Sequence, residues 1–425
     1  MTSTDPGVGR DVADRCPGVL RLAQAADGRL ARIRLPGGLI TGGQLRALAG
    51  LAGELGDGRI ELTSRGNVQL RALQADAAEP LTAALTRVGL LPSLDHDRVR
   101  NVLASPLAGL DDLGSGRDLS VIVAALDAEL RARPRLAELP GRFLFAIDDG
   151  RGDVAGLGAD LVAVVGADVT TVNGLAVRGP MPVVGGPTAN EPVTVQAAPR
   201  SGVDAATGDV VAVLLAFAEA FLDERAAAGS AAWRIADLPG GPERVRATVA
   251  QRFGLAPGSE LPVPVAATRP VGLVRHRADV GGGVEPRFVT PDGFDSAVLL
   301  APLGRLTAAQ VTWLAARAAG RPARITPWRS VVLPDQPDAE AALGEAAGLG
   351  FGVDDGSRWL RVTACAGRPG CASALADVQA DAAAFAARWP GRIVHVSGCG
   401  RHCGRPAATE IDVTATSEGY QVAEV

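Results

Sequence analysis

The chain has 425 residues, of which 47% are hydrophobic and 21% charged, and its acidic residues outnumber the basic ones by five. This composition is that of a globular protein with several domains, and the negative net charge argues against a nucleic-acid partner. The longest apolar run, at 210–222, is interrupted by Glu219 and is shorter than the roughly 20 residues of a membrane span, and residues 1–15 lack the apolar core of a signal peptide, so we expect a cytoplasmic protein with a disordered N-terminus and no membrane partner.

In chain order, the first predicted elements form a small unit at 16–80. The run LRALAGLAGEL at 45–55 has apolar residues three and four positions apart, which indicates a helix, and RIELTSRGNVQLRAL at 59–73 alternates as a strand does. A larger unit at 81–260 follows, with a strand, a helix and a second strand that enters a Gly-rich turn. Its last part, 180–260, contains the Gly/Pro-rich stretch GPMPVVGGPTANEP and an apolar helix.

The second half of the chain repeats this order, with a small unit at 261–338 and a larger one at 339–425. Five pairs of segments match in sequence and order, namely 17–21 with 270–275, 39–45 with 305–311, 60–70 with 323–333, 99–109 with 360–370, and 139–150 with 389–400. Such a duplication predicts an α+β fold of four parts, whose halves are related by a pseudo-twofold axis. It also favours a monomer, because the pseudo-dimer already lies within one chain.

Four of the five cysteines cluster as C-x5-C and C-x3-C, separated by 27 residues, and they are Cys365, Cys371, Cys399 and Cys403. Four thiolates suit a tetrahedral zinc ion or a 4Fe-4S cluster. The first gap is wider than in structural zinc sites, and the neighbouring glycines let backbone amides approach the sulfides of a cluster. The pattern therefore favours iron-sulfur over zinc and over unligated buried thiols. Cys16 stands apart from this cluster of cysteines, in a CPG turn.

The first half of the chain has no cysteine at the repeated positions. It has Ser105 at the position of Cys365, and Asp148 and Asp149 at the positions of Gly398 and Cys399. Only the second half can therefore hold a thiolate-bound centre. Carboxylates are good ligands for non-haem iron, which makes the two aspartates candidates for a mononuclear iron site, although DDG is also a common turn sequence.

Two segments with the cysteines resemble a known family. TACAGRPGC at 363–371 with SGCGRHCG at 397–404 is similar to the cluster signature of the nitrite and sulfite reductases, and the small unit with TSRGNVQL is similar to their ferredoxin-like half-domain. RNVLASPLAG at 100–109 resembles the segment that lines the tetrapyrrole in that family. The resemblance covers about residues 16–415, with Asp412 as a departure where a small residue is expected.

Within that family, CPGVLRLAQAADGRLARIRLPGG at 16–38 and FAIDDGRGDV at 145–154 resemble the precorrin-3B synthases, which take a siroheme-like tetrapyrrole as substrate. The resemblance implies that dioxygen and NADH-derived electrons, delivered by a reductase or ferredoxin, hydroxylate precorrin-3A and close a γ-lactone. The cluster would supply electrons singly, and a mononuclear iron would activate dioxygen. Siroheme is expected as a cofactor only if the chain is instead a sulfite or nitrite reductase.

The resemblance also implies a set of residues around the tetrapyrrole. Guanidinium groups suit a precorrin because its acetates and propionates are carboxylates. The predicted substrate-binding residues are Arg65, Asn67, Arg98, Arg100, Asn101, Arg142 and Arg329, and the predicted catalytic residues are Asp148, Asp149 and His402. A surface ion pair is the alternative role for each arginine, a local backbone cap for each asparagine, and an ordinary turn position for His402.

Two other functions fit parts of this pattern. Sulfite and nitrite reduction needs several cations over the distal face of the tetrapyrrole, and GRFLF at 141–145 has Arg142 at the first matching position but Leu144 at the second. A non-catalytic electron carrier or zinc-stabilised scaffold would explain the cysteines, but it leaves the arginine motifs of both halves without a purpose.

Overall fold

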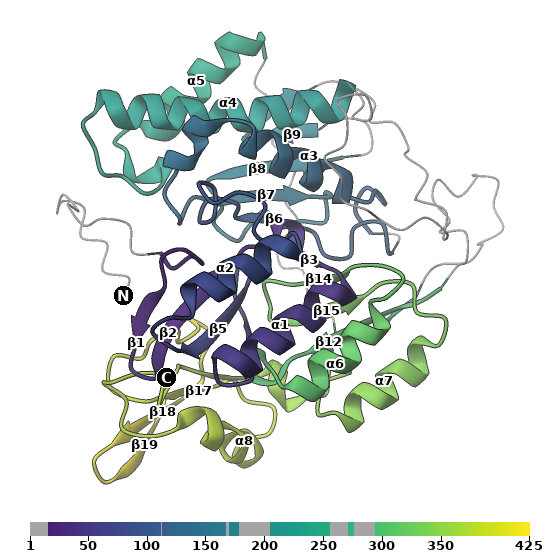
Figure 1. Ribbon diagram of the computed structural model, residues 1–425, viewed down its shortest axis with the longest axis vertical. Coiled ribbons are helices and arrows are strands. Elements are labelled where there is room, and N and C mark those ends of the chain that lie inside the picture. The colour runs from purple at the N-terminus through teal and green to yellow at the C-terminus, as the bar shows by residue number, and fades with distance from the viewer. Residues whose placement is uncertain (1–15, 112, 167–169, 178–204, 256–270, 276–293) are drawn as a thin grey trace. The chain divides into compact units, whose positions relative to one another are not determined.

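The computed structural model describes residues 16–425, apart from 112, 167–169, 178–204, 256–270 and 276–293 (Figure 1). The chain divides into two compact units. Unit 1 consists of residues 1–16, 93–109 and 113–267, and unit 2 of residues 17–92, 110–112 and 268–425. Among the described residues, no helix is both long and apolar enough to cross a membrane.

Unit 2 contains the two predicted small units, and each has the same series of elements. The first consists of β1 (Ala23–Ala25), β2 (Gly28–Ile33), η1 (Pro36–Gly38), β3 (Leu39–Ile40), α1 (Gly42–Leu55), β4 (Ile60–Leu62), β5 (Val68–Leu73) and α2 (Ala78–Arg87). The second consists of β11 (Gly272–Val274), β12 (Ser296–Leu300), η4 (Pro302–Gly304), β13 (Arg305–Leu306), α6 (Ala308–Arg317), β14 (Ala323–Ile325), β15 (Ser330–Leu333) and α7 (Ala339–Gly348). The duplication read from the sequence is confirmed in these halves.

The same local chemistry starts the first long helix of each half. Thr41 caps α1 and Thr307 caps α6, and each hydroxyl accepts a hydrogen bond from the backbone of the glutamine three residues later. The glutamine side chains, Gln44 and Gln310, accept in return from the threonine backbone amides. This reciprocal capping box satisfies two of the free amides at each helix start.

The two halves exchange short strands. Their sheets have the orders β1-β2-β5-β4-β13 and β11-β12-β15-β14-β3, so β13 of the second half completes the first sheet and β3 of the first half completes the second. Helices α1 and α6 pack side by side, as their purple and green ribbons show in Figure 1. One hydrophobic core containing side chains of both halves joins them, so neither half can fold into its observed form alone.

The predicted strand at 59–73 is wrong in one respect, because it is a hairpin of β4 and β5. The Thr63 hydroxyl accepts hydrogen bonds from the backbone amides of Arg65 and Asn67, and Gly66 takes the left-handed conformation at φ +63° that the turn requires. The alternation of polar and apolar residues continues across the turn, which conceals it in the sequence.

The C-terminal part of unit 2 is a separate sheet layer. Its elements are η5 (Arg358–Leu360), β16 (Val362–Ala364), α8 (Val378–Arg388), β17 (Val394–Ser397), β18 (Ile411–Thr416) and β19 (Gly419–Glu424). The strands β16, β17 and β18 are parallel, and β19 returns antiparallel at the edge. Val378, Ala382 and Ala386 of α8 pack on one face of this sheet and form its core together with the strand residues. This confirms the strand, helix and strand expected in the larger unit.

Unit 1 has a related sheet of order β10-β9-β8-β7-β6. Its elements are β6 (Val102–Ala104), α3 (Ser120–Arg131), η2 (Pro134–Glu138), β7 (Phe145–Asp148), β8 (Leu161–Val165), β9 (Thr170–Val172), β10 (Leu175–Val177), α4 (Ala205–Ala227), η3 (Ile235–Asp237) and α5 (Gly241–Phe253). The helix α4 contains the predicted apolar run, contacts α3 and covers β8 and β9. The Gly/Pro-rich stretch before it lies outside the described residues.

Candidate functional site

The four cysteines lie on two loops that follow neighbouring parallel strands. Cys365 comes directly after β16, and Cys399 follows β17 by two residues. Because the carboxyl ends of parallel strands meet at one edge of a sheet, the folding of β16 against β17 brings these loops together. Cys371 and Cys403 complete the two loops, and the side chains range from half-buried to exposed.

Backbone amides and glycines shape the space around the thiols. The Gly398 amide donates to the Cys365 Sγ at 3.1 Å, and a Cβ on Gly398 would lie 2.7 Å from the Ala374 Cβ. A tetrahedral zinc ion would hold four sulfurs about 3.8 Å apart. An amide hydrogen bond to a ligand sulfur and a cradle without side chains are the surroundings that suit a larger iron-sulfur cluster.

The register of the strands corrects the alignment of the two halves. The Ser105 amide donates to the carbonyl of Ile147 as the Cys365 amide donates to that of Val396. The Asp149 amide donates to the Ser105 Oγ at 3.1 Å, as the Gly398 amide does to the Cys365 Sγ. Ser105 therefore does correspond to Cys365, as predicted.

The aspartates, in contrast, are displaced by one position from the expected match. Asp149 corresponds to Gly398 and Asp148 to Ser397. The predicted match of Asp148 with Gly398 and of Asp149 with Cys399 is therefore wrong. An ungapped comparison of sequences cannot detect a one-residue difference in the loops between the strands.

Several polar side chains lie on the face of the β16–β19 sheet that is opposite α8. Burial lowers the pKa of His395 to about 4, so its imidazole is neutral at pH 7, and its Nδ1 lies 2.8 Å from the Thr363 hydroxyl. The Asp412 carboxylate accepts a hydrogen bond from Arg405 at 2.6 Å and lies 3.0 Å from Nδ1 of His402. Asp412, the departure from the family pattern, thus ties the loop that carries Cys403 to β18.

A cavity of about 520 Å³ in unit 2 opens beside these loops. Cys365 and Cys403 contribute to its wall, together with Thr363, Trp328 and Trp359. Among the described residues, the charged side chains of its lining are four arginines and one glutamate, namely Arg32, Arg71, Arg305, Arg329 and Glu61. The lining is therefore cationic and partly aromatic, which suits a flat ligand with several carboxylates.

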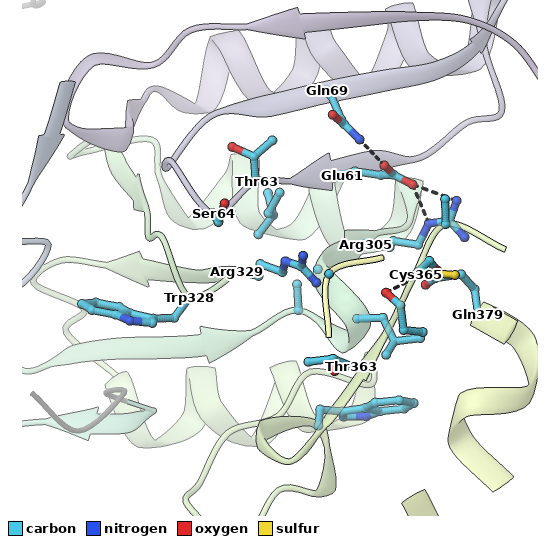
Figure 2. A pocket seen from close by; sticks show the side chains of 18 of the residues that line it. Glu61, Thr63, Ser64, Gln69, Arg305, Trp328, Arg329, Thr363, Cys365 and Gln379 are labelled. Carbon is cyan, nitrogen blue, oxygen red and sulfur yellow. Dashed lines mark hydrogen bonds and ion pairs between the residues drawn. The ribbon is translucent and has the colours of Figure 1, made fainter. Parts of the chain in front are cut away.

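One row of polar side chains runs across the first sheet and forms part of this wall. Arg32, Gln69, Glu61 and Arg305 are direct neighbours on β2, β5, β4 and β13. Arg32 donates to Gln69 at 3.1 Å, Gln69 donates to Glu61, and Arg305 donates to Glu61 at 2.9 Å. Figure 2 shows Gln69, Glu61 and Arg305 of this row, joined by their hydrogen bonds. The matching row of the second sheet is apolar except for Arg324.

Two strained residues of the second half also face the cavity. Arg329 has φ +62° where the first half has Gly66, and Leu303 has φ +53° where the first half has Gly37 at φ +64°. Both line the cavity, and the Arg329 guanidinium points toward its middle in Figure 2. A left-handed backbone costs a non-glycine residue about 1–2 kcal/mol, and such costs are typically retained at functional sites.

The other residues predicted in unit 2 occupy different surroundings. Arg65 is half-buried in the β4–β5 turn, and the described lining of the cavity includes its neighbours Thr63 and Ser64 but not Arg65 itself. Asn67 is buried, and its side-chain oxygen accepts a hydrogen bond from the Leu35 amide at 2.9 Å. His402 is half-buried at the left-handed φ of +49°.

Four predicted substrate-binding residues belong to unit 1. Arg100 is buried and forms two hydrogen bonds to Asp127, and the Asn101 amide group donates to three backbone carbonyls. Arg142 is exposed and stacks over Trp233 at 4.7 Å, and Arg98 is half-buried. Arg100 and Asn101 thus have clear structural roles, while the binding role of all four stays a prediction.

The aspartates of unit 1 form a compact carboxylate group with Asp153. Ligand oxygens of Asp148, Asp149 and Asp153 lie within 4.8 Å of one another. However, the two oxygens of Asp148 accept four backbone amide hydrogen bonds, and Asp149 is held by two nitrogens of Arg151. Protein donors would have to leave before an ion could bind, so this arrangement does not fit a resident iron.

Comparison with known proteins places the fold. The family model described as the nitrite/sulfite reductase ferredoxin-like half domain matches residues 23–88. The solved structure of the NirA protein of Mycobacterium tuberculosis superposes with a TM-score of 0.65 at 20% identity, over 93% of this chain and 73% of that one. The fold is that of the nitrite and sulfite reductases.

The chain is similar in sequence to nitrite reductases, to a precorrin-3B synthase and to sulfite reductases. A ferredoxin–nitrite reductase of Synechococcus elongatus is 28% identical over 90% of this chain and 75% of its own length. A precorrin-3B synthase of Sinorhizobium is also 28% identical, over 95% of this chain and 81% of its own. A ferredoxin-linked sulfite reductase of Mycolicibacterium paratuberculosis is 26% identical over 92% of this chain and 72% of its own. The chain is thus similar over most of its length to oxidoreductases.

Sequence reasoning missed the polar row and Arg71, which are prominent in the cavity. Arg32, Gln69 and Glu61 each lie between two buried apolar residues of their strand, as Glu61 lies between Ile60 and Leu62, whereas Arg305 is the first residue of the two-residue strand β13. That alternation marks a solvated or ligand-facing side, but only the pairing of β4 with β13 from the other half brings the four side chains into one line.

Proposed function

We propose that this protein is an oxidoreductase that holds a 4Fe-4S cluster on Cys365, Cys371, Cys399 and Cys403 and acts on a tetrapyrrole in the adjoining cavity. The observation that carries the proposal is the shared wall, because Cys365 and Cys403 line the same cavity as four arginines. A cluster there would supply electrons one at a time to a ligand in van der Waals reach of its cysteines.

The reaction that fits best is the conversion of precorrin-3A to precorrin-3B. One oxygen atom of dioxygen enters the macrocycle as a hydroxyl, the other leaves as water, and two electrons derived from NADH with two protons balance the step. The hydroxyl and the carboxyl oxygen of a ring acetate add to the two carbons of one macrocycle double bond, the carboxyl proton passes to the new oxygen, and the γ-lactone closes without loss of a further atom. The precorrin-3B synthase of Sinorhizobium, which is 28% identical over 95% of this chain, supports this choice.

The residues of this chain have defined tasks in that reaction. Arg32, Arg305 and Arg329 bind the peripheral carboxylates, and Glu61 with Gln69 holds two of these cations in a fixed row. Trp328 and Trp359 offer apolar faces to the macrocycle. Gln379 donates to the carbonyl of Cys365 and so orients the cluster loop against the cavity.

The second candidate is a siroheme-dependent nitrite or sulfite reductase, which the relatives from Synechococcus and Mycolicibacterium favour. Two residues of unit 1 argue against this function. Leu144 is buried where a second cation is expected, and the neighbouring Arg142 is engaged with Trp233. A cavity that reduces small anions needs such cations free to face the ligand.

Anaerobic purification with iron, sulfide and absorption analysis separates these functions. We expect about four iron and four sulfide per chain and a broad absorption without a tetrapyrrole band. A siroheme band in the purified protein would favour the reductase, and zinc without sulfide would favour a scaffold. Turnover of precorrin-3A by a Cys371→Ser variant, if equal to that of the unaltered protein, would remove the cluster from the mechanism.

A further inference from the structure

Arg71 connects the first half-domain to the loop that carries Cys371. It is 8% exposed, and its guanidinium forms two hydrogen bonds of 3.1 Å to Asp27, whose side chain is also 8% exposed. The Nη2 atom also donates to the carbonyl of Gly370 at 2.9 Å. Gly370 directly precedes Cys371, so the ion pair of one domain holds the backbone of a predicted cluster ligand in another.

The backbone of β5 is shaped to aim Arg71 in this direction. Arg71 and Ala72 together oppose the single residue Leu30 on β2, because the register shifts between the pairs Arg29 with Leu73 and Ala31 with Leu70. Ala72 has the left-handed φ of +51°. This is a β-bulge, a device that re-aims a side chain at a local cost.

Glycines make room on both sides of the contact. A Cβ on Gly370 would lie 2.6 Å from the Nη2 atom of Arg71, and a Cβ on Gly28, which has φ +133°, would lie 2.9 Å from the carbonyl oxygen of Leu73. The close approach therefore depends on the absence of two side chains as well as on the bulge.

We infer that Arg71 is a positioning residue for Cys371 and that the Arg71–Asp27 pair sets the reduction potential of the cluster. This inference rests on the proposed 4Fe-4S site. Reduction adds one negative charge to a cluster that four thiolates already make anionic, so a nearby guanidinium favours the reduced form and a nearby carboxylate disfavours it. The low exposure of the pair limits screening by water and salt.

Opposite charge changes at the two partners test this. In Arg71→Gln the Asp27 carboxylate remains alone and the midpoint potential should fall. In Asp27→Asn the guanidinium remains alone and the potential should rise. The double variant should return toward the unaltered value, and Arg71→Lys, which keeps the charge, should deviate less than Arg71→Gln. Potentials are measured by electron paramagnetic resonance in a redox titration.

Arg392→Gln is the matched control. Arg392 pairs with Glu410 in the same C-terminal part of unit 2 as the cysteine loops, but both side chains are 41% exposed. The midpoint potential of the cluster should therefore not change in this variant. Iron and sulfide are measured for every variant. Their absence from the unaltered protein refutes the cluster itself, whereas a full cluster with shifts in the same direction in both single variants refutes the role of Arg71. If Arg71→Gln fails to assemble a cluster, Asp27→Asn decides, and an unchanged or lowered potential there refutes the inference.

Discussion

Two substitutions of Arg329 should weaken ligand binding equally but differ in their effect on stability. Its backbone is left-handed at φ +62°, and Gly66 occupies the equivalent position of the first half at φ +63°. Replacing Arg329 by glycine or by alanine removes the guanidinium in both cases, but only glycine relieves the backbone. The comparison of these two variants therefore isolates the cost of the conformation from the loss of the side chain.

The expected difference follows from two terms. A left-handed backbone costs alanine about 1–2 kcal/mol, and the greater freedom of glycine in the unfolded chain costs about 0.5–1 kcal/mol. Arg329→Gly should therefore be more stable than Arg329→Ala by about 0.5–1 kcal/mol. The measurement is the free energy of unfolding in urea, followed by circular dichroism.

Binding should fall equally in both variants. Loss of one charge-assisted hydrogen bond to a carboxylate costs about 1.5–3 kcal/mol, or roughly tenfold or more in affinity. Fluorescence titration with uroporphyrin, a stable polycarboxylate tetrapyrrole, measures it. Arg317→Ala is the control, because Arg317 pairs with Asp338 and Glu345 on the side of α6 and does not line the cavity. Equal stability of the two Arg329 variants, or unchanged uroporphyrin binding, would refute the reasoning.

Three further predictions concern the Cys399 loop, the carboxylate group of unit 1 and the polar row. Gly398→Ala should lower the iron and sulfide content, because the new Cβ would lie 2.7 Å from Ala374 and 3.5 Å from the Cys365 Sγ; normal content would contradict the tight cradle. Burial raises the pKa of Asp153 to about 7 from 3.8, so its contribution to folding is full below pH 4 and is lost as the pH rises to 7. The unfolding free energy of Asp153→Asn, relative to that of the unaltered protein, should therefore rise by up to about 4 kcal/mol between pH 4 and pH 7. A difference between the two proteins that does not change with pH would contradict the raised pKa of Asp153. Glu61→Gln should lower the unfolding free energy by about 1 kcal/mol while uroporphyrin still binds, and an unchanged denaturation midpoint would show that the polar row is not a stabilising unit.

The repeated halves could be predicted from the sequence because their signals are local. The helix at 45–55 is confirmed as part of α1, and the matching TGGQ and TAAQ segments each form a capping box that marks where a helix starts. The exchange of β3 and β13 between the halves could not be predicted, because strands of two residues carry no periodic pattern and their partners are distant in sequence.

The site was predicted where chemistry is carried by rare residues and missed where it is carried by common ones. Because the chain has only five cysteines, the clustering of four of them was enough to predict which loops form the site. An arginine does not reveal its partner, so Arg100, buried against Asp127, and Arg329, strained toward the cavity, were indistinguishable in the sequence. Asp148 was predicted as a possible metal ligand, but its carboxylate accepts hydrogen bonds from four backbone amides of the following loop. The path of that loop could not be predicted from the spacing of residues in the sequence.

The most direct test of the proposed function is a turnover of precorrin-3A by the anaerobically purified protein, started with ¹⁸O-labelled dioxygen and a reducing system based on NADH. Mass spectrometry of the product should show one ¹⁸O atom incorporated per molecule, with the Cys371→Ser variant giving none. Unlabelled or absent product from a protein that contains its full cluster, together with reduction of nitrite or sulfite by the same preparation, would contradict the proposal.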